Sequence, residues 1–431
     1  MVKVVESSLV VPSAKTPKHK LWVSNLDLLA PRTHTTSVYF YRPNLKNGSS
    51  NFVCVESLKA SLAKVLVTFY PFAGRLGVNE ETGRVEIVCN GEGALFLKAE
   101  ANLTIDEFGD FTPSMKTRKL LVPTVDTSTS SCPLLLLQVT FFKCGGVCLG
   151  VGVHHTVSDG AASLHFFNTW TNVSRGLDIA VPPFLDRTVL KARSPPTVLF
   201  NHTEYRRNPT SKNQEPFFSA LLNLSKDQLN ILKRKSSNTV NGSVDTYSTY
   251  ETVASHIWCA ACRARGLDST QESRLYITAD ARSRLQPPIT RAYLGNAIFT
   301  SSVIVKVGEI TSKPIEHVAN LIRQAISRLD DKYLRSSLDF LETQEDDLGT
   351  LGRGSGTFPS TDLSVVSWTR LPLYDADFGW GRPSFVGPAT FFYGGLAYIM
   401  PSPSKEGDIL IALSLETEHM SSFSKLFYQF E

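Results

Sequence analysis

The sequence predicts an α/β protein built from two similar-sized domains, and three observations favour this class. The chain has 431 residues, more than one ordinary hydrophobic core organises. Strand-like and helix-like apolar patterns occur in both halves. Between the halves lies a stretch rich in proline and polar residues without sustained periodicity. We therefore expect an N-terminal domain over 1–180, a crossover linker over 181–217 and a C-terminal domain over 218–431.

The first half begins with a helix and continues with short strands. Apolar residues at helical spacing alternate here with short apolar runs of strand length. After Asp159 and Gly160 the apolar period changes from that of a buried strand to that of an amphipathic helix. The expected elements are a helix over 55–69, strands over 84–89 and 93–100, a hairpin over 133–155 turning at 143–146, and a helix over 161–177.

The second half repeats this mixture of elements. Its helical patterns are long and its strand-like runs are rich in branched apolar residues. The expected elements are a helix over 248–267, a strand over 274–282, one long helical stretch from 314 to 342, and strands over 363–371, 394–401 and 407–415.

Composition limits the classes of partner. The formal net charge is only +4 and no basic run is long enough to follow a phosphate backbone, so we expect no nucleic-acid partner. No segment supplies the roughly 20 apolar residues that a membrane helix needs. The N-terminal residues lack the apolar stretch of a signal peptide, and the seven cysteines, an odd number, suggest reduced thiols. We therefore expect a cytoplasmic protein that binds no membrane.

Residues 154–160 read HHTVSDG and form the first candidate functional site. A metal site is disfavoured, because a catalytic zinc needs three protein ligands and the sequence offers no HExxH and no second cluster. The pair Cys259 and Cys262 lies in an apolar helical pattern and is expected in the core. Proton transfer by histidine is the better functional interpretation. Alternation along a strand points His154 and His155 to opposite faces, so only one can face a given cavity. An ordinary capped turn with a satisfied histidine remains the alternative.

A second motif, DFGWG, occupies 377–381. An HxxxDG motif in mid-chain followed by DFGWG near the C-terminus resembles the plant BAHD acyltransferases. The stretches FYPFAGRL, FKCGGVCLGVG and DADFGWGRP resemble the hydroxycinnamoyl-CoA:shikimate/quinate branch of that family. The resemblance runs essentially end to end. It implies a fold like that of chloramphenicol acetyltransferase, with a channel between two α/β domains.

The resemblance also implies a mechanism and residue roles. His155 would deprotonate an acceptor hydroxyl that attacks an acyl-CoA thioester directly, with no acyl-enzyme, no metal and no cofactor besides the acyl-CoA co-substrate. Asp159 would pair with Arg282 of the DxRxR segment, and Asp377 and Trp380 would shape the scaffold. Trp368 would place its indole N–H near the developing oxyanion. Arg353 would bind the carboxylate of the acceptor, and the strand residues Thr35, Ser37 and Tyr39 would bond its hydroxyls. The implied CoA contacts are Ser248, Thr249, Arg282, Arg284, Thr369 and Arg370.

One position departs from the branch. Val366 stands where shikimate-using members commonly have a threonine, and a valine side chain cannot donate the corresponding hydrogen bond. The expected activity is transfer of a p-coumaroyl or caffeoyl group to shikimate or quinate by a monomer. Three alternatives remain: a BAHD enzyme with a phenyllactate, amine or alcohol acceptor, a peptide condensation domain of related fold, and a non-catalytic binding module that kept the fold. DFGWG and the lack of an attached carrier domain argue against the second, and an intact His155 argues against the third.

Overall fold

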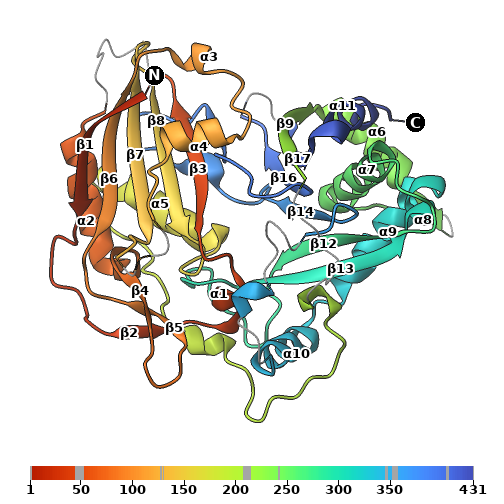
Figure 1. Cartoon of the computed structure of the whole chain (residues 1–431), viewed down its shortest axis with the longest axis horizontal. Helices are drawn as coiled ribbons and strands as arrows, with labels where there is room; N and C mark the ends of the chain where they lie inside the picture. Colours follow the sequence, from red (N-terminus) through yellow and green to blue (C-terminus); the bar gives the residue numbers. More distant parts are fainter. Residues whose placement is uncertain are drawn as a thin grey trace.

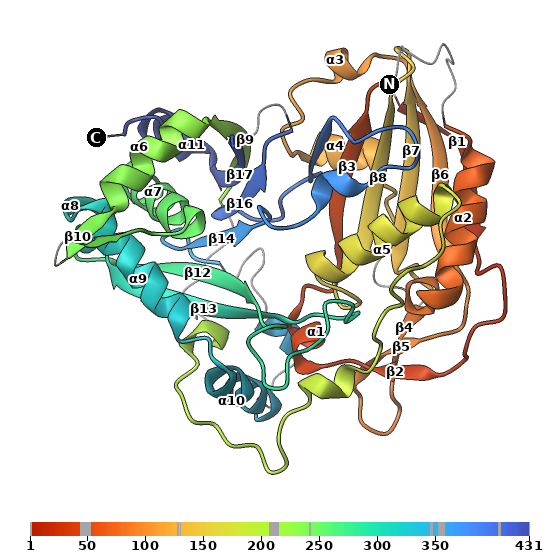
Figure 2. The same cartoon turned by 180° about the vertical axis from the view of Figure 1, so that it is seen from behind.

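The structure is a computed structural model of the whole chain (Figure 1). It describes residues 2–43, 53–126, 129, 131–206, 215–240, 243–344, 348–351, 358–403 and 407–430. The described strands form two large sheets that lie side by side, with helices covering the outer face of each (Figures 1 and 2). This mixed two-part architecture confirms the predicted α/β class.

The first sheet carries the N-terminal motif. Its six described strands are ordered β1-β6-β7-β8-β3-β15. Strands β7 and β8 form the predicted antiparallel hairpin, joined through a turn at 143–146. The strands are β1 (Val2–Val10), β6 (Ala94–Ala101), β7 (Leu135–Phe142), β8 (Val147–His154), β3 (His34–Tyr41) and β15 (Phe385–Pro388). Three shorter strands, β2 (Lys20–Trp22), β5 (Val85–Val88) and β4 (Arg75–Val78), make a small separate sheet.

The second sheet belongs to the C-terminal half. Its six described strands are ordered β13-β12-β14-β16-β17-β9. They are β13 (Ile298–Lys306), β12 (Glu272–Asp280), β14 (Leu363–Ser367), β16 (Leu396–Pro401), β17 (Ile409–Glu416) and β9 (Phe217–Leu224), with a small hairpin of β10 (Asn238–Val240) and β11 (Ser243–Asp245) beside them.

One strand crosses between the halves. Residues Phe385–Pro388 follow the DFGWG segment late in the chain, yet β15 pairs antiparallel with β3 of the first sheet. The first sheet is therefore completed by the C-terminal half, and a cut between 217 and 218 would separate paired strands. The boundaries expected from the sequence do not describe this exchange.

The described helices are divided between the two halves of the chain. In the first half they are α1 (Asn25–Leu29), α2 (Val55–Thr68), α3 (Ile105–Phe108), α4 (Met115–Leu121) and α5 (Gly160–Ser174). In the second half they are α6 (Lys226–Ser236), α7 (Thr249–Ala264), α8 (Val307–Ser312), α9 (Ile315–Ser327), α10 (Asp331–Glu342) and α11 (Thr417–Phe427). None of these described helices is both long enough and apolar enough to cross a bilayer.

The long helical stretch expected from 314 to 342 is present, but a short break divides it into two helices. Helix α9 ends at Ser327, and Asp330 starts α10 by accepting a hydrogen bond from the backbone N–H of Tyr333 at 2.8 Å. An N-cap of this kind satisfies a helix donor that would otherwise lack a partner. The apolar face of α9 packs in the core of the second sheet, whereas Leu334 and Leu338 of α10 belong to a different hydrophobic cluster, which contains residues of both halves.

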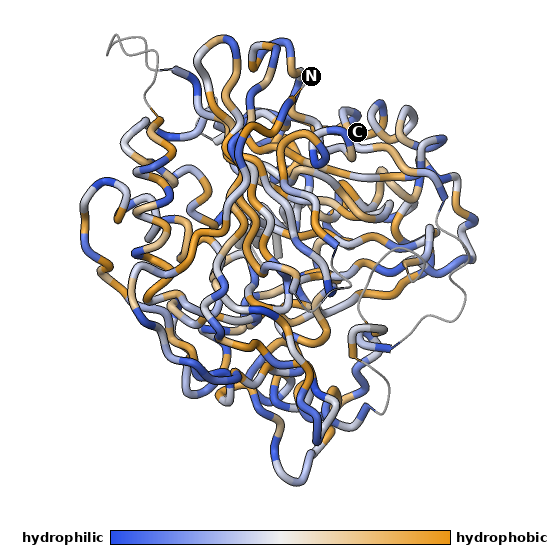
Figure 3. The backbone as a smooth tube through the Cα atoms, turned by 60° about the vertical axis from the view of Figure 1, so that its left-hand side comes forward, coloured by the Kyte–Doolittle hydropathy of each residue, from blue (hydrophilic) through white to orange (hydrophobic). Residues whose placement is uncertain are grey.

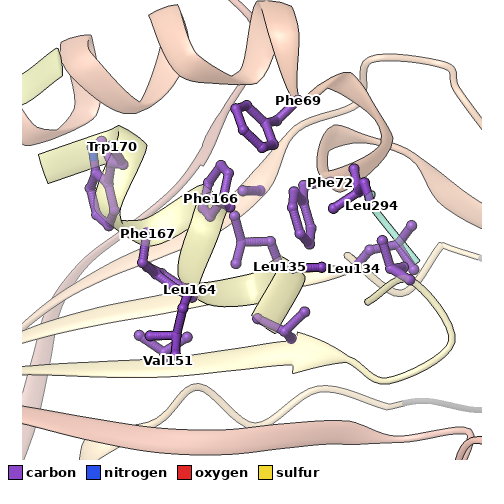
Figure 4. Packing of buried hydrophobic residues seen from close by; sticks show 14 of the residues in the cluster. Phe69, Phe72, Leu134, Leu135, Val151, Leu164, Phe166, Phe167, Trp170 and Leu294 are labelled. Atoms are coloured by element: carbon purple, nitrogen blue, oxygen red, sulfur yellow. The ribbon is translucent and has the colours of Figure 1, made fainter. Parts of the chain in front are cut away.

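Helix α5 fixes the end of the hairpin that carries the motif. Its residues Phe166 and Trp170 pack between the first sheet and α2 (Figure 4). The indole N–H of the buried Trp170 donates to the Ser61 hydroxyl at 3.0 Å. Figure 3 shows hydrophobic stretches gathered toward the interior of the molecule and hydrophilic ones in many of the outer loops. The strand-to-helix connection at 155–159 is thus held by rigid packing on both sides.

Candidate active site

A cavity of about 1830 Å³ lies between the two sheets. Residues from both sheets line it, including Thr35 and Ser37 of β3 and Tyr398 of β16. His155 lies on its wall, directly after β8. The described residues contain no group of three or more His, Cys, Asp or Glu side chains arranged to hold a metal ion. The cavity offers a histidine in a partly apolar site, an arrangement suited to proton transfer.

The two adjacent histidines have different surroundings, as strand alternation predicts. His155 is half-buried and lines the cavity, and its backbone N–H donates to the carbonyl of Thr33 at 2.9 Å. His154 points away into the protein, where its ring meets that of His34 edge to face at 5.2 Å. Burial, together with the nearby His34, lowers the pKa of His154 to about 3, so this imidazole is neutral at pH 7.

Asp159 caps helix α5. Its Oδ1 accepts from the backbone N–H of Ala162 at 2.9 Å, and its Oδ2 lies 2.9 Å from the Arg282 guanidinium and accepts from Ala297 N–H at 3.0 Å. The ion pair expected between the motif aspartate and the DxRxR arginine is therefore present. Burial alone lowers the pKa of Arg282, but the charges of Asp159 and Asp280 raise it overall. Both carboxylate oxygens of Asp159 are thus engaged, and its structural role stays a prediction.

The DFGWG segment folds into a tight loop outside the cavity wall. Asp377 Oδ1 accepts from the backbone N–H groups of Gly379 and Gly381 at 2.7 and 2.9 Å. Both glycines have positive φ angles, +94° and +93°, which side chains with a Cβ rarely adopt. Phe378 and Trp380 stack on each other and the Tyr41 hydroxyl donates to the carbonyl of Ala376 at 2.7 Å. The loop leads the chain from the second sheet to β15, which agrees with the scaffold role implied for Asp377.

The structure describes most of the residues expected near the acceptor, but not all of them. Thr35, Ser37 and Tyr39 follow one another on the cavity-facing side of β3. Trp368 also lines the cavity, with its ring 4.5 Å from that of Tyr398, and Val366 lies on the same wall. Arg353 lies outside the described residues. The structure thus brings the hydroxyls of β3 and the Trp368 ring to the cavity that holds His155, while their roles stay predictions.

The expected CoA contacts fall into two groups. Ser248 and Thr249 at the start of α7 and Thr369 and Arg370 after β14 line the cavity. The two arginines of the DxRxR segment have structural partners. Arg282 is paired with Asp159 and Asp280, and Arg284 donates to the carbonyls of Ile326, in the last turn of α9, and Leu329, just beyond it. Both arginines also line the cavity. A role for any of them in CoA binding stays a prediction.

Three residues beside the site escaped the sequence analysis. Asp27, Arg187 and Asn296 are buried and hold the backbone that follows β8. One local signal was available, because Ser24 and Asp27 have the spacing of a capping box and do form one at α1. No pattern in the sequence connects that box to the two other residues, which lie more than 150 positions away.

Two sheets lie around a shared cavity, and the histidine of the HxxxDG motif lies on the cavity wall. This arrangement is that of the two-domain acyltransferases. Vinorine synthase has this fold, with a TM-score of 0.74 and 24% identity over 98% of this chain and 96% of that one. The model of the Transferase family matches residues 1–430, and the chain belongs to this family, the BAHD acyl-CoA-dependent transferases.

Two relatives of the chain are similar over its whole length. It is 49% identical to a shikimate O-hydroxycinnamoyltransferase from Nicotiana tabacum over 100% of both chains. It is also 46% identical to a hydroxycinnamoyl-CoA:5-hydroxyanthranilate N-hydroxycinnamoyltransferase from Avena sativa, over 99% of each. These two relatives are named for the same acyl group and for acceptors of different chemistry.

Proposed function

We propose that the protein transfers a hydroxycinnamoyl group, p-coumaroyl or caffeoyl, from its CoA thioester to a hydroxyl of shikimate or quinate. The observation that carries the proposal is the position of His155. Its imidazole lies on the wall of the shared cavity, while the carboxylate of Asp159 is engaged by Ala162, Arg282 and Ala297. His155 is thus the group that can accept a proton from a bound hydroxyl. The relative from Nicotiana tabacum, named for this reaction, supports the substrate class.

The reaction proceeds in two steps without an acyl-enzyme. His155 accepts the proton of the acceptor hydroxyl as its oxygen attacks the thioester carbonyl, which forms a tetrahedral oxyanion beside the indole N–H of Trp368. The intermediate then collapses, the C–S bond breaks, and CoA leaves as a thiolate that takes the proton from His155. A positioned base of this kind contributes roughly 100- to 10,000-fold to the rate. One oxyanion donor contributes roughly 3 kcal/mol.

The identity of the acceptor is the more specific part of the proposal. Thr35, Ser37 and Tyr39 line the cavity, and the hydroxyls of the half-buried Thr35 and Ser37 would suit a polyhydroxylated acid, while Arg353 would bind its carboxylate through two parallel hydrogen bonds. Val366 gives the same cavity an apolar wall where a threonine would add a donor. Val366 leaves the transfer chemistry unchanged but weakens the case for shikimate in particular, and an amine, an alcohol or a phenyllactate is the alternative acceptor.

An acceptor panel tests the proposal. Purified protein is incubated with p-coumaroyl-CoA and, in turn, shikimate, quinate, a phenyllactate, an aromatic amine and an uncharged alcohol, and thiol release and product mass are measured. We expect shikimate or quinate to give the highest kcat/KM. Arg353→Ala should lower kcat/KM about tenfold for the acids, while the uncharged alcohol is unaffected. A higher kcat/KM for an amine would reassign the acceptor, and no thiol release with any acceptor would identify a binding module.

The remaining parts of the proposal concern partners and location. We propose a cytoplasmic monomer that takes only small-molecule substrates and uses no metal and no cofactor besides acyl-CoA. A thiolate is a good leaving group and needs no Lewis acid. Activity should persist after exhaustive chelation, and a loss that zinc restores would contradict this.

A further inference from the structure

We propose that Asp27, Arg187 and Asn296 act together as positioning residues that set the orientation of His155; the inference rests on the proposed role of His155 as the base. Three consecutive backbone carbonyls after β8 are held by side chains of two of these residues. Asn296 Nδ2 donates to the carbonyl of His155 at 2.8 Å. Arg187 donates from Nη1 to the carbonyl of Thr156 at 3.3 Å and from Nη2 to that of Val157 at 2.7 Å.

Asp27 joins the two donors into one network. Its Oδ1 accepts from the backbone N–H and from the side-chain Nδ2 of Asn296, at 2.8 and 2.9 Å. Its Oδ2 lies 2.9 Å from Arg187 Nη1 and accepts from the N–H and hydroxyl of Ser24, both at 2.8 Å. The exposed fractions of Asp27, Arg187 and Asn296 are 0%, 3% and 4%. A buried charge pair with this many hydrogen bonds holds a defined geometry.

The network draws on three distant segments of the chain. Asp27 is in α1, which lies where the two halves meet (Figure 1), Arg187 is in the crossover, and Asn296 is just before β13. Arg187 and Asn296 bond the connection between β8 and α5 directly, and Asp27 bonds both of them. The backbone there is therefore fixed by the assembled fold and not by local sequence, and its position is sensitive to each of the three contacts.

His155 depends on its backbone more than most catalytic histidines. A base histidine is usually oriented by a carboxylate or carbonyl bonded to its Nδ1. The Nδ1 of His155 is buried and has no hydrogen-bond partner among the described residues. Its orientation therefore rests on the peptide groups on either side, of which one donates to the carbonyl of Thr33 and the other accepts from Asn296. A misplacement of about 1 Å at a reacting group can cost about 100-fold in rate.

The test separates positioning from stability by comparing two buried arginine–carboxylate pairs. Arg187→Lys keeps the charge beside Asp27 but loses the planar fork that reaches two carbonyls. Arg265→Lys is the matched control, because Arg265 makes a two-point pair with Glu416 at 2.9 Å and donates to the carbonyl of Asp362, away from the cavity wall. Asn296→Ala removes the donor to the His155 carbonyl and leaves the Asp27–Arg187 pair in place.

We expect Arg187→Lys and Asn296→Ala to lower kcat about tenfold or more, with KM for p-coumaroyl-CoA within about twofold of wild type. Each variant is assayed at the same interval below its own Tm, and Arg265→Lys should then keep the wild-type kcat. If Arg187→Lys does not fold, the kcat and KM of Asn296→Ala decide whether the inference holds.

Two results would overturn the inference. One is an unchanged kcat in the folded Arg187→Lys and Asn296→Ala variants, and the other is an equal loss in Arg265→Lys. A wild-type protein that transfers no acyl group would instead refute the proposed function, so the two failures are distinguishable.

Discussion

At the scale of single residues, the adjacent histidines His154 and His155 have different surroundings and different expected roles. Strand alternation and the HxxxDG pattern together single out His155, and the structure places its side chain on the cavity and that of His154 in the interior. His155→Ala should lower kcat roughly 100-fold or more while acyl-CoA still binds, because a base is lost and the cavity is kept. Steady-state kinetics and calorimetric titration with CoA measure the two effects. A folded His154→Ala variant with the larger loss of kcat would reverse the assignment.

The buried pair of His34 and His154 makes the free energy of unfolding depend on pH. Burial lowers the pKa of His34 to about 4 and that of His154 to about 3, from an unfolded value near 6.5. The unfolded chain therefore binds protons that the folded chain does not, and the free energy of unfolding decreases as the pH falls from about 6.5 toward 4. Each histidine contributes about 1.4 kcal/mol per pH unit in this window. Urea unfolding at several pH values should show this slope and a shallower one in His154→Gln; equal slopes would contradict it.

At the scale of elements, local patterns predicted the strands and helices around the site but not their breaks. The hairpin of β7 and β8 and the helix after it are where alternation and the change of period place them. The break between α9 and α10 was missed because a continuous apolar pattern spans it while the two helices face different cores. Likewise the motif residues were predicted, whereas Asp27, Arg187 and Asn296 were not, since isolated polar residues carry no periodic signal.

Substitution of Asp159 tests whether this residue stabilises the connection from β8 to α5 or takes part in catalysis. In Asp159→Asn the cap on Ala162 can persist, but the buried Arg282 loses one of its two carboxylate partners and Ala297 N–H loses its acceptor. Breaking a buried pair costs roughly 3–5 kcal/mol, and we expect a loss near the lower end because Asp280 still faces Arg282. Urea unfolding measures this loss. Wild-type stability with a selective loss of kcat would instead favour a catalytic dyad of Asp159 and His155.

At the scale of the whole molecule, the sequence predicted two α/β halves and could not predict how they are joined. Pairing of β15 with β3 connects residues about 345 positions apart, and no local period encodes such a partner. Helix α10 is the second link, since its apolar residues belong to a hydrophobic cluster that contains residues of both halves, and it contacts α1. The cavity that holds His155 is consequently built by both halves and does not exist in either one alone.

This exchange predicts that the N-terminal half does not fold by itself. A fragment of residues 1–217 lacks Phe385, which packs on Phe40, and lacks Leu334, Leu338 and other buried side chains of α10. Full burial of one such side chain contributes about 1.5–3 kcal/mol, so losing several approaches the whole stability of about 5–15 kcal/mol of a typical domain. It would also leave β3, paired only with β8, as an edge strand with one side unpaired, which promotes aggregation.

Fragment 1–217 should therefore lack a cooperative urea transition and near-ultraviolet circular dichroism. Co-expression with 218–431 should restore both signals together with acyl transfer, because β15 and α10 are then supplied in trans. Cooperative unfolding of fragment 1–217 alone would mean that the first sheet is stable without β15, and that the crossing strand serves to close the cavity instead of completing the core.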